Sequence, residues 1–243
     1  MAKNVSRRKF LRQAAAGAAA SAAIAPVVNA TAGVAVQASP AQASQQASAP
    51  PVKEGYTFLN ANEAAFIEAF VDLIVPADEL TPSGTDLGLA AFIDRQLAGA
   101  WGKGERFYRQ GPWKEGSPGQ GYQLPLTPAE FFRAGISAVN KHCKELDGKE
   151  FDRLAAPDKE KVIEDLVSGK ISLGEISGPQ FFDLAHQATM EGMFGDPIYG
   201  GNRNKAAWKM IGYPGVIAVH ATNIETYRNK PYVVNPVSIT DLM

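Results

Sequence analysis

The sequence predicts an all-α fold: a single compact domain of about five or six helices, with long loops rich in glycine and aromatic residues and an extended C-terminal tail. Apolar residues recur at helical spacing in several separate segments. Capping residues, prolines and glycines stand where those segments begin and end. No internal repeat or strand-rich block interrupts the pattern, and 243 residues suit one domain plus extensions.

The N-terminus carries a twin-arginine export motif, followed by an alanine-rich apolar run and a small-residue cleavage site. We predict that residues 1–30 are a signal peptide for the Tat (twin-arginine) translocase, cleaved after Ala30, which places the protein in the periplasm. An uncleaved anchor is the alternative, but the run of about fifteen residues is short for the ~20 that span a bilayer. The motif residues are Arg7, Arg8, Phe10 and Leu11.

Residues 31–55 consist mainly of alanine, serine, glutamine and proline, with no charge before Lys53. Such a segment buries too little apolar surface to offset the entropy of ordering it, so we expect a flexible linker. The helical domain is expected over residues 56–226. Prolines and β-branched residues favour an extended tail over residues 227–243.

The first two helices are predicted from caps and periodicity. Asn60 or Asn62 can cap a helix that ends before Pro76, and Asp86 can cap a second helix that Gly99 ends. Acids on polar faces and in turns are usually solvated, so we assign none of those here a catalytic role. These acids are Asp72, Asp78, Glu79 and Asp94.

Residues 99–126 form a long loop in which aromatic residues alternate with basic ones. Aromatic residues and arginine are enriched in protein interfaces, which favours a partner-binding role. The alternative is that the loop folds its aromatic side chains onto its own helices. The residues concerned are Trp101, Lys103, Arg106, Phe107, Tyr108, Arg109, Trp113 and Tyr122.

Thr127-Pro-Ala-Glu130 is a capping box with proline at the first helical position. The helix that follows has an apolar seam of Phe132, Ile136, Val139, Cys143 and Leu146. Cys143 is the only cysteine, and two hypotheses stay open for it. It is either a buried, inert core thiol or, in an oxidising compartment, a disulfide to a partner subunit.

The last helices are predicted from the same signals, which are apolar periodicity and the residues that begin and end a helix. One opens at Ala156 and ends at Gly169, and another starts at Pro179 and is apolar around much of its circumference, which indicates a central position. Lys205 to Ile211 is expected to be a short helix that displays Trp208. The histidines show no metal-ligand spacing, so we expect structural roles for them: His142, His186 and His220.

Composition excludes several classes of function. The formal net charge is −1, and without the five basic residues of the first thirty it is −6, which argues against nucleic acid as a partner. A single cysteine excludes an internal disulfide and a cysteine-only metal site. No dinucleotide, phosphate-loop, zinc-protease or serine-hydrolase motif is present. We therefore assign no catalytic, cofactor-binding or metal-binding residue.

The segment from Glu191 to Gly215 is rich in glycine and turn signals and indicates a shaped loop. It contains the motifs Asp196-Pro-Ile-Tyr-Gly-Gly-Asn-Arg203 and Trp208-Lys-Met-Ile-Gly-Tyr-Pro-Gly215. Through these motifs its sequence resembles the small subunit (subunit 3, or gamma) of membrane-bound gluconate 2-dehydrogenases. The segments 101–113 and 121–128 resemble that family too. The resemblance runs from about Phe58 to Gly215.

The resemblance implies a complex with a flavin-dependent catalytic subunit of the glucose–methanol–choline type and a multihaem cytochrome c subunit that passes electrons to quinone. FAD and haem c would lie on those partners, where a sugar or sugar acid is oxidised. This chain would be the non-catalytic export escort and stabiliser of the flavoprotein subunit, held at the inner membrane through its partners. Twin-arginine export suits this, because that route carries folded cargo. The alternatives are a free-standing exported interaction protein or an independent enzyme that uses acids such as Glu191 or Asp196.

Residues in two segments are candidates for partner contacts, by motif and by interface-prone chemistry. For the second glycine-rich segment the alternative is that the same residues brace the loop itself. The candidates are Trp101, Arg106, Tyr108, Trp113, Asp196, Tyr199, Gly200, Gly201, Asn202, Arg203 and Trp208.

Overall fold

The computed structural model describes residues 55–114 and 116–243. The predicted signal peptide (1–30), its cleavage after Ala30 and all of the predicted linker (31–55) except its last residue lie outside the described residues, so they stay predictions. None of the helices that are described is long and apolar enough to cross a membrane.

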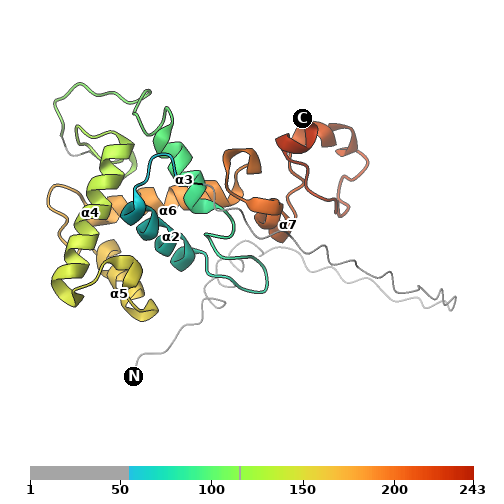
Figure 1. The fold of residues 1–243 in the computed structure, drawn as a ribbon. Helices are drawn as coiled ribbons and strands as arrows, with labels where there is room; N and C mark the ends of the chain where they lie inside the picture. The colour runs from blue at the N-terminus through green and yellow to red at the C-terminus, as the bar shows by residue number, and fades with distance from the viewer. Residues whose placement is uncertain (1–54, 115) are drawn as a thin grey trace, which may run out of the picture. The chain divides into compact units, whose positions relative to one another are not determined.

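The described residues form six α-helices joined by short 3-10 helices and loops, with isolated bridges but no strand among them, which confirms the all-α prediction. Figure 1 shows their arrangement. The helices are α2 (Ala61–Ile74), α3 (Leu89–Ala98), α4 (Pro128–Asp147), α5 (Ala156–Val167), α6 (Gly178–Phe194) and α7 (Ala206–Ile211). The 3-10 helices are η1 (Pro118–Gln120), η2 (Phe151–Arg153), η3 (Pro197–Tyr199), η4 (Arg203–Lys205), η5 (Ile217–Asn223) and η6 (Ile239–Leu242).

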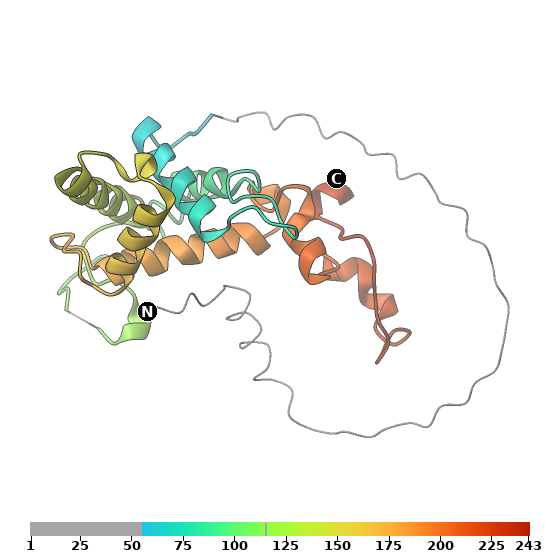
Figure 2. The same ribbon diagram turned by 90° about the horizontal axis from the view of Figure 1, so that it is seen from below.

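Helix α6 is the central element. It packs against α2, α3, α4, α5 and α7 (Figure 2), as its apolar circumference predicts. Glycines permit the close approach: a Cβ at Gly135 of α4 would lie 2.2 Å from the Phe181 ring, and one at Gly192 would lie 2.8 Å from Phe92. The core therefore forms on both sides of one helix.

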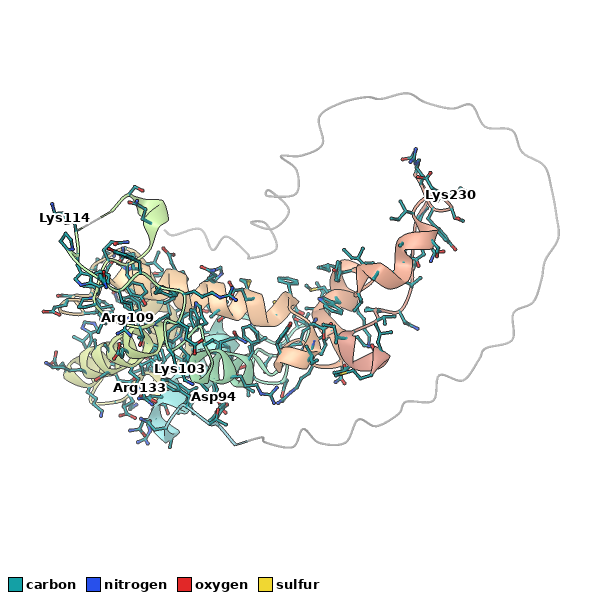
Figure 3. All side chains as sticks on the ribbon, turned by 90° about the horizontal axis from the view of Figure 1, so that it is seen from above. Asp94, Lys103, Arg109, Lys114, Arg133 and Lys230 are labelled. Carbon is teal, nitrogen blue, oxygen red and sulfur yellow. The ribbon has the colours of Figure 1, made fainter. Side chains whose placement is uncertain are left out.

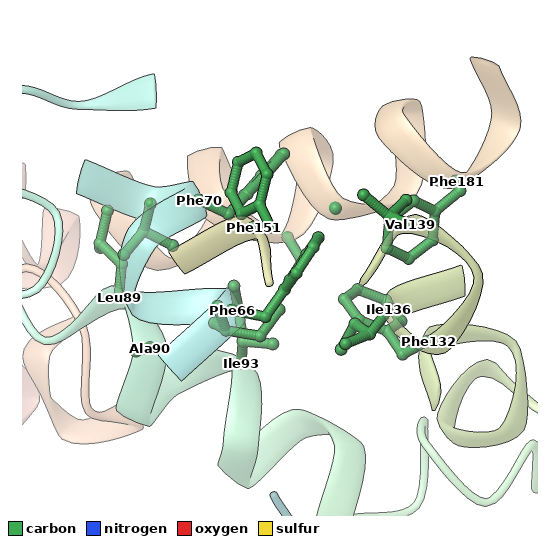
Figure 4. Close-up of a cluster of buried hydrophobic side chains, with 14 of the residues drawn as sticks. Phe66, Phe70, Leu89, Ala90, Ile93, Phe132, Ile136, Val139, Phe151 and Phe181 are labelled. Atoms are coloured by element: carbon green, nitrogen blue, oxygen red, sulfur yellow. The ribbon is translucent and has the colours of Figure 1, made fainter. Parts of the chain in front are cut away.

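Phenylalanines fill the core where α2, α4, α6 and η2 meet (Figure 4). Phe66, Phe132, Phe151 and Phe181 are completely buried. The ring centroids of Phe66 and Phe151 are 4.8 Å apart, and Phe132 meets Phe181 edge-on at 6.1 Å. Truncating such a side chain to alanine typically costs about 3–5 kcal/mol, so this cluster supplies much of the stability that holds the loops in place.

Two predicted helix starts are confirmed and one is wrong. Asn60 accepts hydrogen bonds from the Asn62 and Glu63 backbone N–H groups, and the Thr127 capping box is present. Asp86 does not cap α3, because that helix starts two residues later than a cap at Asp86 requires, after Gly88 in the left-handed region (φ 81°). Without a Cβ, Gly88 adopts this conformation at little cost, and no side chain is needed to turn the chain there.

Asp94 is not the solvated acid that its place on α3 suggested. The residue is only 2% exposed, and its carboxylate accepts four hydrogen bonds of 2.8 or 2.9 Å, from the backbone N–H groups of residues 57–59 and the Thr57 hydroxyl. Burial alone raises the pKa of Asp94, but the backbone hydrogen bonds from Leu59, Thr57 and Phe58 outweigh it, so the pKa lies below its usual range. The role of Asp94 is to anchor the chain entering α2.

The apolar seam of α4 ends earlier than predicted. Phe132, Ile136, Val139 and Cys143 are buried, but Leu146 is 67% exposed. The last turn of α4 is bordered by solvated lysine and glutamate side chains, so the prediction that Leu146 belongs to the core is wrong. Helical spacing defines a face, but it does not tell how far neighbouring elements cover it.

Candidate partner-binding surface

The glycine-rich segment 191–215, here called the signature loop, is braced by two buried side chains. Asn202 is fully buried; its amide nitrogen donates to the Gly195 carbonyl (3.1 Å), and its amide oxygen accepts from the Ala207 N–H (3.0 Å). Trp208 is 4% exposed, and its indole N–H donates to the Phe194 carbonyl at 2.7 Å.

These positions correct two of the sequence predictions. Trp208 is not displayed on α7, and neither Trp208 nor Asn202 offers its side chain to a partner in this structure. Both side chains form hydrogen bonds with backbone groups of the loop. Buried backbone N–H and C=O groups outside regular secondary structure need such partners. For these two residues the bracing alternative holds.

Gly200 and Gly201 let the signature loop cross α3 and α6 closely. A Cβ at Gly201 would lie 2.2 Å from the Gly192 carbonyl oxygen. Gly200 has φ 105°, and a Cβ there would lie 2.6 Å from the Arg95 guanidinium. Both glycines therefore shape the loop by their lack of a side chain.

The backbone of η4 is unusual, because three non-glycine residues in this short region have positive φ: Asn202 (46°), Asn204 (58°) and Lys205 (56°). A non-glycine residue in the left-handed region costs of order 1–3 kcal/mol unless its surroundings hold it there, although asparagine tolerates it well. Lys205 is held by an ion pair to Asp241 at 2.7 Å. That bond and those from Ser238 lower the pKa of Asp241 to about 2.

Asp196 joins the signature loop to the C-terminal tail. One carboxylate oxygen accepts from the Ile198 N–H (3.0 Å) and caps η3, and the other accepts from the Ile239 N–H (2.9 Å). Both oxygens are thus engaged in structure. Of the candidates in this loop, Tyr199 is the one whose side chain faces solvent, at 53% exposure.

Arg203 is half-buried beside α3. Its backbone N–H donates to the Leu87 carbonyl at 3.1 Å. Its side chain lines a small cavity of about 70 Å³ together with Tyr56 and Glu68, and the Tyr56 hydroxyl donates to Glu68 at 2.6 Å. Burial and this hydrogen bond raise the pKa of Tyr56 above its usual value. Arg203 therefore joins the signature loop to α2 and α3.

In the aromatic loop, residues 99–126, some aromatic side chains fold onto the helices and others stay exposed. Trp101 packs edge-on against Phe132 (6.2 Å), and Tyr122 stacks on Phe131 (4.2 Å), so these side chains fold onto their own helices. Tyr108 is 78% exposed, Arg106 is exposed and Trp113 is half-buried. Around them lies a groove of about 610 Å³, here called the loop groove.

An exposed apolar surface near the C-terminus was not predicted. Most large apolar side chains exposed in the described part of the chain lie at or after Phe194. Ile217 (64%), Ile224 (62%) and Tyr227 (40%) border an apolar groove of about 340 Å³, and Val233 nearby is 91% exposed. We call these four residues the C-terminal apolar face. The feature of the sequence that could have indicated it is the recurrence of isoleucine, valine and tyrosine after Gly215.

Histidine and tyrosine side chains fix the backbone beneath this face. His220 Nε2 donates to the Pro214 carbonyl at 3.0 Å, and Nδ1 lies 2.8 Å from the Tyr232 hydroxyl, which also accepts from Asn223 (2.9 Å). The tail returns to the signature loop through a bridge between Gly215 and Val237. His220 thus has the structural role that was expected.

Cys143 is a free thiol with no exposed surface. Burial, and then the nearby Asp147, raise the pKa of the thiol to about 11. A buried, protonated thiol is a poor nucleophile, so the geometry supports the inert-core hypothesis over the disulfide to a partner. Within residues 55–114 and 116–243, no group of three or more histidine, cysteine or acidic side chains is placed to hold a metal ion.

A braced loop, a half-exposed aromatic loop and an uncovered apolar face are the features of a helical subunit that binds another protein. The model of one protein family, gluconate 2-dehydrogenase subunit 3, matches residues 61–215. The chain belongs to this family, which confirms the resemblance drawn from its motifs and makes it a subunit of a dehydrogenase complex of that kind. Comparisons with curated proteins and with solved structures found no match.

Proposed function

We propose that this chain is a non-catalytic subunit that escorts and stabilises the FAD-dependent catalytic subunit of a sugar or sugar-acid dehydrogenase. The observation that carries the proposal is the C-terminal apolar face, on a chain of the gluconate 2-dehydrogenase subunit 3 family. Exposed apolar patches on a folded protein mark interaction sites. The flavoprotein covers this face in the assembled complex.

The docking geometry follows from the shape of that surface. The groove between Tyr213, Ile217 and Ile224 is apolar and large enough for an aromatic or aliphatic side chain of the partner. Tyr199, exposed on the signature loop, offers a further amphipathic side chain for contact with a partner. The buried braces Asn202 and Trp208 contribute indirectly, because they hold the loop in one conformation and so lower the entropic cost of binding.

The export signal predicted at the N-terminus supports the escort role. A twin-arginine signal suits a cargo that folds in the cytoplasm, and we assign FAD, the catalytic base and the substrate pocket to the partner. The folded pair crosses the membrane together, and a multihaem cytochrome c subunit then passes electrons to quinone at the periplasmic side of the inner membrane. In the structure, Asp196, a candidate acid for an independent enzyme, has both oxygens engaged in structural hydrogen bonds.

The test is co-purification with a tagged FAD-dependent subunit from the native host. Ile224→Asp places a charge on the C-terminal apolar face, and we expect it to release this chain from the partner. The control is Val167→Asp, an exposed apolar position on α5 (46%, against 62% for Ile224), which should leave the complex intact. Retention of the Ile224→Asp chain in stoichiometric amount contradicts docking through this face, and a wild-type chain that binds no flavoprotein contradicts the escort role.

A further inference from the structure

Positive charge is concentrated in one part of the aromatic loop, residues 103–114, here called the basic segment. It carries four basic side chains and one acid, Glu105, and all five are exposed. The next acid in the sequence, Glu115, lies outside the described residues. None of the four basic side chains forms an ion pair with an acid of the described residues, whereas most basic side chains elsewhere in the described chain do. The four are Lys103, Arg106, Arg109 and Lys114, and Figure 3 labels three of them.

Two exposed aromatic side chains lie within the basic segment. Tyr108 is 78% exposed and Phe107 is 44% exposed. In the sequence they stand side by side, between Arg106 and Arg109. Adjacent exposed rings beside arginines that form no ion pair are typical of a surface that another molecule covers.

The helical core holds the base of the basic segment in place. Phe107 stacks on Tyr122 with ring centroids 6.5 Å apart, and Tyr122 stacks on the fully buried Phe131 at 4.2 Å. The backbone turns at Gly104, whose N–H donates to the Trp101 carbonyl (2.9 Å) and whose carbonyl accepts from the Phe107 N–H (3.1 Å). The ring stack is therefore a brace. It presents the exposed side chains in a fixed arrangement, which lowers the entropic cost of binding.

A bilayer that contains anionic lipid suits both features of the basic segment. The four basic side chains are spread along twelve residues of the loop, whereas a small ligand is held by polar groups that converge on one point. Lipid phosphates cover a whole plane, so they can pair with basic side chains at several points of a loop. Rings such as that of Tyr108 join an apolar body to a polar tip, which favours the boundary between headgroups and hydrocarbon.

We infer that the basic segment binds directly to the surface of an anionic phospholipid bilayer, with the Tyr108 ring at the depth of the headgroups. Arg106 and Arg109 pair with lipid phosphates on either side of the rings, and the two lysines add attraction that salt can screen. The contact is peripheral, because only the tip of a loop enters the headgroup region. It uses no residue of the C-terminal apolar face, so the inference goes beyond the proposed escort role and does not depend on it.

The test is sedimentation of the purified chain with sucrose-loaded vesicles of phosphatidylcholine, made with and without phosphatidylglycerol. We expect the chain to bind the vesicles that contain phosphatidylglycerol, to bind them less as salt is added, because salt screens the surface charge, and to bind pure phosphatidylcholine weakly. Residues 1–30 contain basic and apolar side chains too, so the comparison is made between variants that share the same N-terminus. Equal binding of the wild-type chain to both kinds of vesicle contradicts the inference.

A charge variant tests the arginines. Arg106→Gln combined with Arg109→Gln should weaken binding to the anionic vesicles about twentyfold, since each basic side chain near a charged membrane surface contributes about fivefold. The matched control combines Lys149→Gln with Lys209→Gln, which removes the same amount of charge from exposed positions outside the basic segment. The control should bind nearly as well as the wild-type chain, and equal binding of the two double variants overturns the inference.

A tryptophan at the tip of the loop tests the depth of the contact. Tyr108→Trp should show more fluorescence quenching by brominated lipid than the wild-type chain does. Leu146→Trp, at an exposed position (67%) at the other end of α4, is the control and should show no increase. Equal quenching in the two variants means that the loop does not enter the headgroups.

An acidic protein surface is the other possible occupant of the basic segment. In that case the arginine double variant loses a protein that accompanies the wild-type chain from native membranes, and the two chains bind vesicles equally. That pair of results overturns the lipid assignment and identifies the segment as a protein interface.

Discussion

Replacing Asp94 by alanine removes the carboxylate that anchors residues 57–59, which lead into α2. Four hydrogen bonds of 2.8 or 2.9 Å are lost together. Bonds to a charged acceptor are worth about 1.5–3 kcal/mol each, but they are not additive. The Thr57 groups can rebind water because Thr57 is exposed, whereas the N–H of Leu59 stays buried and unpaired. We therefore expect the free energy of unfolding to fall by about 3–5 kcal/mol.

The assay is urea unfolding of the purified chain, followed by far-UV circular dichroism. Asp94→Asn should cost less than alanine, because one oxygen remains as an acceptor, but its new N–H groups face other donors. The control Asp86→Ala changes an exposed aspartate that bonds only Ser83 in the described structure, and we expect a change within about 0.5 kcal/mol. An Asp94→Ala effect no larger than that of the control refutes the anchoring role.

The same carboxylate gives a pH dependence with a definite sign. Its pKa in the folded state is lowered, so its stabilisation is fully present above the unfolded value of about 3.9 and is lost as pH falls through the folded pKa. The difference in unfolding free energy between wild type and Asp94→Asn should therefore be constant near neutral pH and shrink below about pH 4. A difference that grows on acidification contradicts the assignment.

Three further predictions concern buried positions. Gly201→Ala forces a Cβ to within 2.2 Å of the Gly192 carbonyl oxygen and should lower stability by about 1–3 kcal/mol in thermal unfolding. Gly119→Ala, with open space around it, should leave stability unchanged. If both substitutions lower stability equally, the close approach of Gly201 to the Gly192 carbonyl is contradicted. Trp208→Phe keeps an aromatic ring but loses its hydrogen bond, for a cost of about 1 kcal/mol in urea; no loss means that the bond is not needed. Cys143 should react with a thiol reagent only after denaturation, and fast reaction of the native chain disproves its burial.

Local patterns predicted local structure well. The capping box at Thr127 and the cap at Asn60 lie within the few residues that form them, so reading the sequence was sufficient. Asp94 shows the limit. Its hydrogen-bond donors lie 35 to 37 residues earlier, and nothing in the periodicity of α3 tells that another segment will cover its polar face.

The candidate surface was predicted in part, for the same reason. The glycines, prolines and aspartate of the signature loop indicated a shaped loop, but they left open whether Asn202 and Trp208 contact a partner or turn inward to brace it, as the structure shows. The C-terminal apolar face was missed because the exposure of Ile217 and Ile224 depends on how η5 and the tail pack, and isoleucine is usually buried. Family motifs located the signature loop, whereas the C-terminal apolar face lies beyond the matched residues 61–215. Only the packing showed which side chains brace the structure and which are exposed.

The most direct test of the central claim is to purify the chain from solubilised membranes and periplasm of its native host, with a tag in the segment predicted to be a linker. A visible absorption spectrum and mass spectrometry then identify what accompanies it. The account predicts a flavin spectrum and a stoichiometric FAD-dependent oxidoreductase subunit. A colourless chain that purifies alone from both fractions contradicts the claim that it escorts a flavoprotein.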